Sequence, residues 1–100
     1  MSTGSPRSFQ RADELPLPGG DFRLFVQRLA YQTLIGLGLL ENPLTHAKEA
    51  HPAQARSLLD DLLMLRDKTR GNLAPDEEEH LARVIRDLEH HYRAVERRAP

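Results

Sequence analysis

Glu77 and His80 have the spacing that most resembles a metal centre in this chain. Glu-x-x-His on a helix is the motif of carboxylate-bridged metal bundles, in which two such motifs and two further inward glutamates surround the ions. The other apolar segments of the chain offer no inward glutamate, so the ligand set is incomplete. A solvated His80 is the simpler interpretation, and a metal-binding helical-bundle enzyme stays an alternative.

Other reactive groups give weaker signals. The chain has no cysteine, which excludes zinc-thiolate sites, thiol nucleophiles and disulfides. Ser57 and Thr69 have no histidine and acid evidently arranged around them. The pair Gly36-x-Gly38 follows no strand and lies in an apolar, helix-forming run, which is more typical of close helix packing than of a phosphate loop. We expect no enzyme, no catalytic residues, no bound metal and no cofactor.

Polar side chains suited to binding gather in two connections. Connections on a rigid scaffold often display binding groups, although loop-to-loop hydrogen bonding is the simpler explanation. In an up-down-up path of three helices the two connections lie at opposite ends, so we expect no shared site in a monomer. The candidates are Asn42, Pro43 and Thr45 in the first connection, and Lys68, Thr69, Gly71 and Asn72 in the second.

These residues are positioned by helices, because apolar residues recur at helical spacing through most of the chain. The fold class that we predict is all-α, a three-helix, bundle-like domain preceded by a disordered N-terminal arm rich in Ser, Pro and Gly. The arm is 1–20 and the domain is 21–98, with helices at about 22–40, 52–70 and 75–97.

The helix ends follow from capping residues. Asp21 supplies an N-cap for the first helix, and Pro43 stops it because proline disfavours helical geometry in the residue before it. Proline at positions 52 and 75 suits the first turn of a helix, and Gly71 suits the position just past a helix end. The third helix has Ala74 where Ser or Thr is the expected cap.

The second and third helices each carry one apolar face. The spacing is that of a single buried stripe, and the opposite face of the third helix carries charges four residues apart, such as Arg83 and Asp87, that predict weak ion pairs. The predicted core residues are Ala55, Leu58, Leu59, Leu62 and Leu65 in the second helix, and Leu81, Ile85, Leu88, Tyr92 and Val95 in the third.

The first helix carries more apolar surface than one face can bury. One stripe comprises Phe22, Phe25, Val26, Leu29, Gly36, Leu37 and Leu40. Nearly opposite lies an outer stripe, defined here as Leu24, Tyr31 and Ile35. We expect this outer stripe to bind a partner, with Met64 on the outer side of the second helix as an adaptable neighbour.

Charge and composition narrow the function classes. The 100 residues contain 14 Lys and Arg against 15 Asp and Glu, so no overall field attracts nucleic acid or an anionic membrane. Arg93, Arg97 and Arg98 form a small basic end, but acidic residues interleave with them, and nucleic-acid binding is a weak second alternative. The first 20 residues hold no apolar run of signal-peptide length, and no segment is apolar enough to span a membrane. We expect a cytoplasmic protein.

Three motifs resemble a bacterial family of small helical proteins, the domain of unknown function 1844. They are FxxFVxxLAxQxLxxLG from Phe22 to Gly38, NPLT at Asn42 to Thr45, and AxxLLDxLxMLxxKTxGNL from Ala55 to Leu73. The resemblance covers roughly 22–95 and implies a compact helical domain in a bacterial cytoplasm. It implies no chemistry and carries over no catalytic residues.

Together these features predict a non-catalytic protein-protein interaction module. Because a core built from about 80 residues is marginal, such a fold is often completed by a copy of itself or by another protein. We expect a homodimer or a small subunit of a regulatory or signalling complex.

Overall fold

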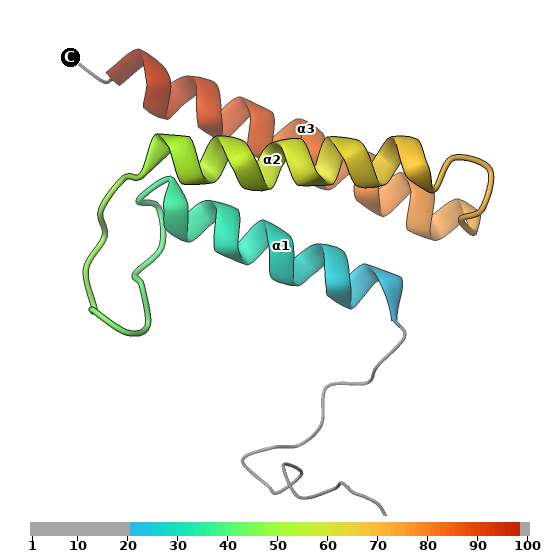
Figure 1. The fold of residues 1–100 in the computed structure, drawn as a ribbon, viewed down its shortest axis with the longest axis horizontal. Helices are drawn as coiled ribbons and strands as arrows, with labels where there is room; N and C mark the ends of the chain where they lie inside the picture. The colour runs from blue at the N-terminus through green and yellow to red at the C-terminus, as the bar shows by residue number, and fades with distance from the viewer. Residues whose placement is uncertain (1–20, 99–100) are drawn as a thin grey trace, which may run out of the picture.

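The computed structural model describes residues 21–98, and within them the chain forms three helices and no strand. The helices run up, down and up, and each contacts the other two (Figure 1). They are α1 (Phe22–Gly36), α2 (Pro52–Lys68) and α3 (Pro75–Arg98). The predicted all-α class is confirmed, whereas the predicted arm 1–20 lies outside the described residues.

The start of α1 follows the capping rule. The Asp21 carboxylate accepts hydrogen bonds from the backbone N–H groups of Arg23 at 3.0 Å and Leu24 at 3.3 Å. These donors belong to the first turn, which has no intrahelical acceptor for them. Asp21 therefore fixes the point at which the chain enters the bundle.

The end of α1 differs from the prediction, since the helix stops at Gly36 and not at Leu40. Gly38 has a φ of +77°, its N–H donates to the Ile35 carbonyl, and the N–H of Leu39 donates to the Leu34 carbonyl. This pair of bonds is a Schellman motif, which closes a helix when a glycine takes the left-handed conformation. Gly38 ends the helix, and only Gly36 serves helix packing, against Ala55 of α2.

The other helix ends are close to those expected. Gly71, just past α2, has a φ of +84°, as predicted. The last turn of α2 ends at Lys68, two residues before the predicted limit. Ala74 lacks a capping side chain, but its N–H donates to the Glu77 carboxylate at 2.9 Å, which is half of a capping box. Glu77 thus satisfies the N–H of the cap residue, which is a different donor from the first-turn N–H groups that a Ser or Thr side chain would serve.

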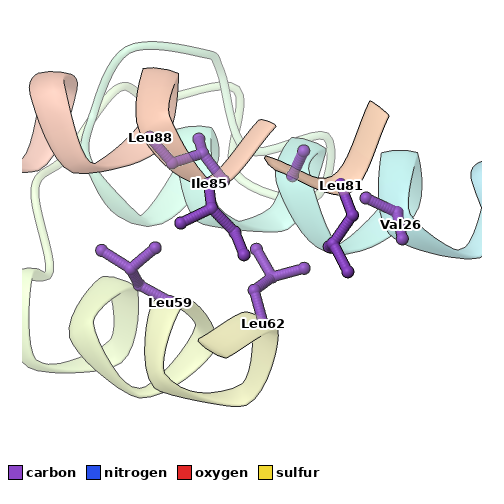
Figure 2. Close-up of a cluster of buried hydrophobic side chains, with 7 residues drawn as sticks. Val26, Leu59, Leu62, Leu81, Ile85 and Leu88 are labelled. Carbon is purple, nitrogen blue, oxygen red and sulfur yellow. The ribbon is translucent and has the colours of Figure 1, made fainter. Parts of the chain in front are cut away.

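The core lies between the three helices, and its side chains converge in Figure 2. The polar residue Thr33 is also fully buried there, and its hydroxyl donates to the Leu29 carbonyl at 2.7 Å, so burial leaves no unpaired donor. The core cluster comprises Val26 and Ala30 of α1, Leu59 and Leu62 of α2, and Leu81, Ile85 and Leu88 of α3.

Some predicted core positions are less buried than expected. Phe25 is 43% exposed, because it lies about 100° around α1 from the buried Val26 and so only at the edge of the core face. Tyr92 and Val95 are partly buried. The Arg56 guanidinium of α2 lies over the Tyr92 ring, 5.3 Å from its centroid, and provides part of this cover.

Candidate functional site

An open groove of about 280 Å³ lies between α1 and α3. Aliphatic side chains from both helices make up much of its lining, and polar groups accompany them on each helix. Tyr31 stands on the α1 side, and 49% of this residue is exposed. The groove is lined by Gln27, Ala30, Tyr31 and Leu34 of α1 and by Val84, Asp87, Leu88 and His91 of α3.

A second, shallow hollow of about 440 Å³ adjoins this groove on the exposed side of α1. Tyr31 and Gln27 line both hollows, so the two form one continuous surface, which we call the α1–α3 surface. Its remaining members, Leu24, Arg28 and Gln32, all belong to α1. An aromatic ring that stands between two hollows has the form of an interface anchor.

The residues of the predicted outer stripe do not all line the α1–α3 surface. Leu24 and Tyr31 line the α1–α3 surface, while Ile35 is partly buried and lines neither hollow. Met64 is 50% exposed, but it belongs to α2 and likewise lines neither hollow. The structure therefore brings Tyr31 together with α3 residues that the sequence analysis did not select, above all Val84, and does not place Met64 beside it.

The first two turns of α1 and the first two turns of α3 are joined by polar contacts. Gln27 Oε1 lies 3.2 Å from His80 Nε2, and Arg23 pairs with Asp76 at 3.6 Å. His80 Nδ1 is buried and has no hydrogen-bond partner within residues 21–98. Burial of the ring, followed by the positive charges of Arg83 and Arg23, lowers the pKa of His80.

The Glu77 and His80 pair is not arranged as a metal site. One Glu77 carboxylate oxygen accepts from the Ala74 N–H, and His80 is turned to Gln27 of α1. In the part of the chain that the structure describes, no group of three or more His, Asp or Glu side chains is placed to hold a metal ion.

The NPLT segment folds into a closed turn. Asn42 Oδ1 accepts from the Leu44 N–H at 2.8 Å, and the backbone carbonyl of Asn42 accepts from the His46 N–H at 2.7 Å. Thr45 Oγ1 accepts from the Ala47 N–H at 3.3 Å. Leu44 at the tip is 88% exposed. The candidate polar groups thus shape the turn, and the residue they display is a leucine that sequence analysis missed.

That leucine could have been found from turn chemistry. Asparagine followed by proline favours a turn, which places the residue after the proline away from the scaffold. Helical periodicity applies only within helices, so it does not indicate which apolar residue of a connection is exposed.

The segment from Lys68 to Leu73, with the sequence KTRGNL, is a helix end closed by its own hydrogen bonds. The Thr69 hydroxyl donates to the Leu65 carbonyl at 2.8 Å, and the Asn72 N–H donates to the Thr69 carbonyl at 2.9 Å. Lys68 is exposed, and Leu73 packs on the core. This connection and the NPLT turn lie at opposite ends of the bundle, as predicted, so they form no common site within one copy (Figure 1).

The basic C-terminal end meets acidic groups of the same helix. A hollow of about 270 Å³ between α2 and α3 is lined by charges of both signs, among them Arg93 and Glu96. Arg56 pairs with Asp60 at 2.6 Å, and this hydrogen bond raises the pKa of the arginine. The mixture of charges offers no continuous cationic track for a phosphate backbone.

Comparison with known proteins identifies the family. The family model described as a domain of unknown function, DUF1844, matches residues 20–94, and the chain therefore belongs to this family. The comparisons with curated proteins and with solved structures gave no match. Within residues 21–98, every helix falls short of the length and apolarity needed to cross a bilayer.

Proposed function

We propose that this chain is a non-catalytic helical module that binds protein through the α1–α3 surface. It acts in the cytoplasm, as a homodimer or as a small subunit of a regulatory or signalling complex. The observation that carries the proposal is the position of Tyr31, which is half exposed between two adjoining hollows. A tyrosine in that setting can bury a large ring while its hydroxyl keeps a polar contact.

The surroundings of Tyr31 support binding to protein over binding to a small molecule. The surface is open and shallow, whereas ligand sites usually enclose most of the ligand. Its aliphatic part, which includes Leu34, Val84 and Leu88, is edged by polar groups, as in the apolar centre and polar rim of protein interfaces. A partner helix or loop fits such a groove.

The proposal is tested with Tyr31→Ala and with Phe25→Ala as the matched control. Phe25 is the other exposed aromatic residue of α1, and it lines neither hollow. Tagged versions of both variants and of the parent chain are expressed in the cell of origin, and co-purifying proteins are quantified alongside sedimentation of the purified chains.

Tyr31→Ala should weaken the association by at least about tenfold, the effect expected of an interface hot spot, while helicity is kept. Phe25→Ala should retain it. Native helicity with unchanged association in Tyr31→Ala would refute the α1–α3 surface. Stoichiometric metal in the purified protein, or a salt-dependent shift of nucleic acid, would instead support the two alternative classes.

A further inference from the structure

We propose that α3 carries a second binding surface, a basic stripe on its exposed side that fits an acidic helix of a partner protein. The stripe lies on the side of α3 that is turned away from the core, so this inference goes beyond the α1–α3 surface and does not depend on it. The α3 basic stripe consists of Arg83, Arg86, His90, Arg93 and Arg97.

The spacing of these residues places them in one line along the helix. They are three, four, three and four positions apart, and at 3.6 residues per turn they fall within an arc of about 80°. The centre of that arc is nearly opposite the buried face formed by Leu81, Ile85 and Leu88. Every other position between Arg83 and Arg97 falls outside the arc, so no acidic side chain interrupts the line.

The charges of the stripe are not neutralised in the described part of the chain. All five residues are exposed, and none of the four arginines forms an ion pair within residues 21–98. The pair between Arg83 and Asp87 that their spacing predicts is therefore not formed there. The arginines repel one another instead, because like charges three or four residues apart are neighbours on a helix. A partner that brings negative charge to this line relieves the repulsion.

Carboxylates border the line on both sides and limit its width. Asp87 lies about 40° beyond Arg83 around the helix, and Glu89 lies about 40° beyond Arg93 on the other side. Glu96 is also on that side, in the hollow between α2 and α3. A nucleic-acid duplex or an anionic membrane is negatively charged over a much wider area, so it would meet these carboxylates as well as the arginines. The flanking charges therefore favour a narrow anionic partner.

A second helix has the required shape. The stripe extends for roughly 21 Å along α3, and acidic residues three and four positions apart on another helix form a line of the same length and width. When the two helices lie side by side, the guanidinium groups can pair with carboxylates along the whole line. Basic residues beside the acidic line of the partner would in turn face Asp87 and Glu89, as charges that flank helix seams do in coiled coils.

Fluorescence anisotropy of a labelled helical peptide tests the stripe. The peptide is built from alanine and lysine with glutamates three and four residues apart on one face, and it is titrated with the full chain at low ionic strength, where screening is weak. The double variant Arg86→Glu/Arg93→Glu should bind it at least about tenfold more weakly than the parent chain. The matched control Arg28→Glu/Arg98→Glu has the same net charge and changes two exposed arginines outside the stripe, and it should keep the affinity.

A second peptide of the same composition, with its glutamates spread evenly around the helix, should bind at least about fivefold more weakly than the one-faced peptide. Absence of binding to the parent chain, equal losses in the two double variants, or equal binding of the two peptides would each overturn the stripe. Tighter binding of a short DNA duplex or of phosphatidylserine vesicles would overturn an acidic helix as its partner.

Tyr31→Ala should bind the one-faced peptide as the parent chain does, so failure of this inference and failure of the proposed function are distinguishable. Circular dichroism monitors folding of every variant. If the double variant with glutamates loses helicity, Arg86→Gln/Arg93→Gln replaces it and should still bind the peptide more weakly than the parent chain, because two of the four guanidinium groups are removed.

Discussion

His80 is a histidine whose two ring nitrogens have different environments. Gln27 Oε1 can only accept, so the contact at 3.2 Å requires the proton on Nε2 and leaves a lone pair on Nδ1. A second proton would put a charged donor on the buried Nδ1, which has no acceptor within residues 21–98. The neighbouring Arg83 and Arg23 oppose that charge as well. The neutral ring therefore belongs to the folded state.

The lowered pKa of His80 predicts a pH effect on stability. The unfolded chain binds a proton to this ring near the ordinary pKa of about 6.5, while the folded chain resists it, so the free energy of unfolding falls as the pH drops through that value. His80→Gln removes the titration. We expect thermal melting at pH 7.5 and 5.5 to differ less in His80→Gln than in the parent chain.

His90→Gln, an exposed change on the same helix, is the control for this experiment. It should keep the pH difference of the parent chain. An undiminished difference in His80→Gln would show that the contact between α1 and α3 at this histidine does not resist protonation.

At the scale of the elements, two glycines end helices, and they differ in how much space surrounds them. Both Gly38 and Gly71 have a positive φ, but a Cβ on Gly38 would lie 3.1 Å from the Ala50 backbone nitrogen, whereas a Cβ on Gly71 would meet nothing within 4 Å. Gly71→Ala should cost roughly 1 to 2 kcal/mol through backbone strain alone. Gly38→Ala should cost at least about 1 kcal/mol more, because the packed loop must also move.

Chemical denaturation of the two alanine variants measures this difference directly. If the two variants lost equal free energy of unfolding, the loop from Leu37 to His51 would be able to move away from the new Cβ without an energetic penalty. The hydrogen bond from the His51 N–H to the Gly36 carbonyl, 2.6 Å long, argues against such freedom, because it ties the end of this loop to the end of α1.

Elements with local signals were predictable from the sequence, and contacts between elements were not. The N-cap at Asp21 and the left-handed Gly71 follow from side-chain and backbone chemistry within a few residues. The early end of α1 was missed because Gly38 reads equally well as a packing residue inside an apolar helix. Val84 and Asp87 entered the surface only through the side-by-side placement of α1 and α3, which the periodicity of a single helix does not encode.

At the scale of the whole molecule, one small core must hold three helices. Its fully buried members come from all three helices, for example Val26 of α1, Leu59 of α2 and Leu81 of α3. No helix can therefore keep its place without the others. A domain of this size has only about 5 to 15 kcal/mol of stability. A single buried charge can remove most of it, whereas a charge on the α1 exterior need not.

This contrast separates folding from binding in one experiment with three aspartate variants. Leu62 is fully buried and Leu88 is 3% exposed, so Leu62→Asp or Leu88→Asp places an unpaired charge in the core and should unfold the domain. Leu24 is partly buried, lies outside the core cluster and lines the α1–α3 surface, so Leu24→Asp should retain most of the helicity and lose association. Far-ultraviolet circular dichroism and sedimentation of the same samples measure both properties. If all three variants lost helicity equally, the outer side of α1 would be part of the core, and the two-faced helix on which the interaction module rests would be wrong.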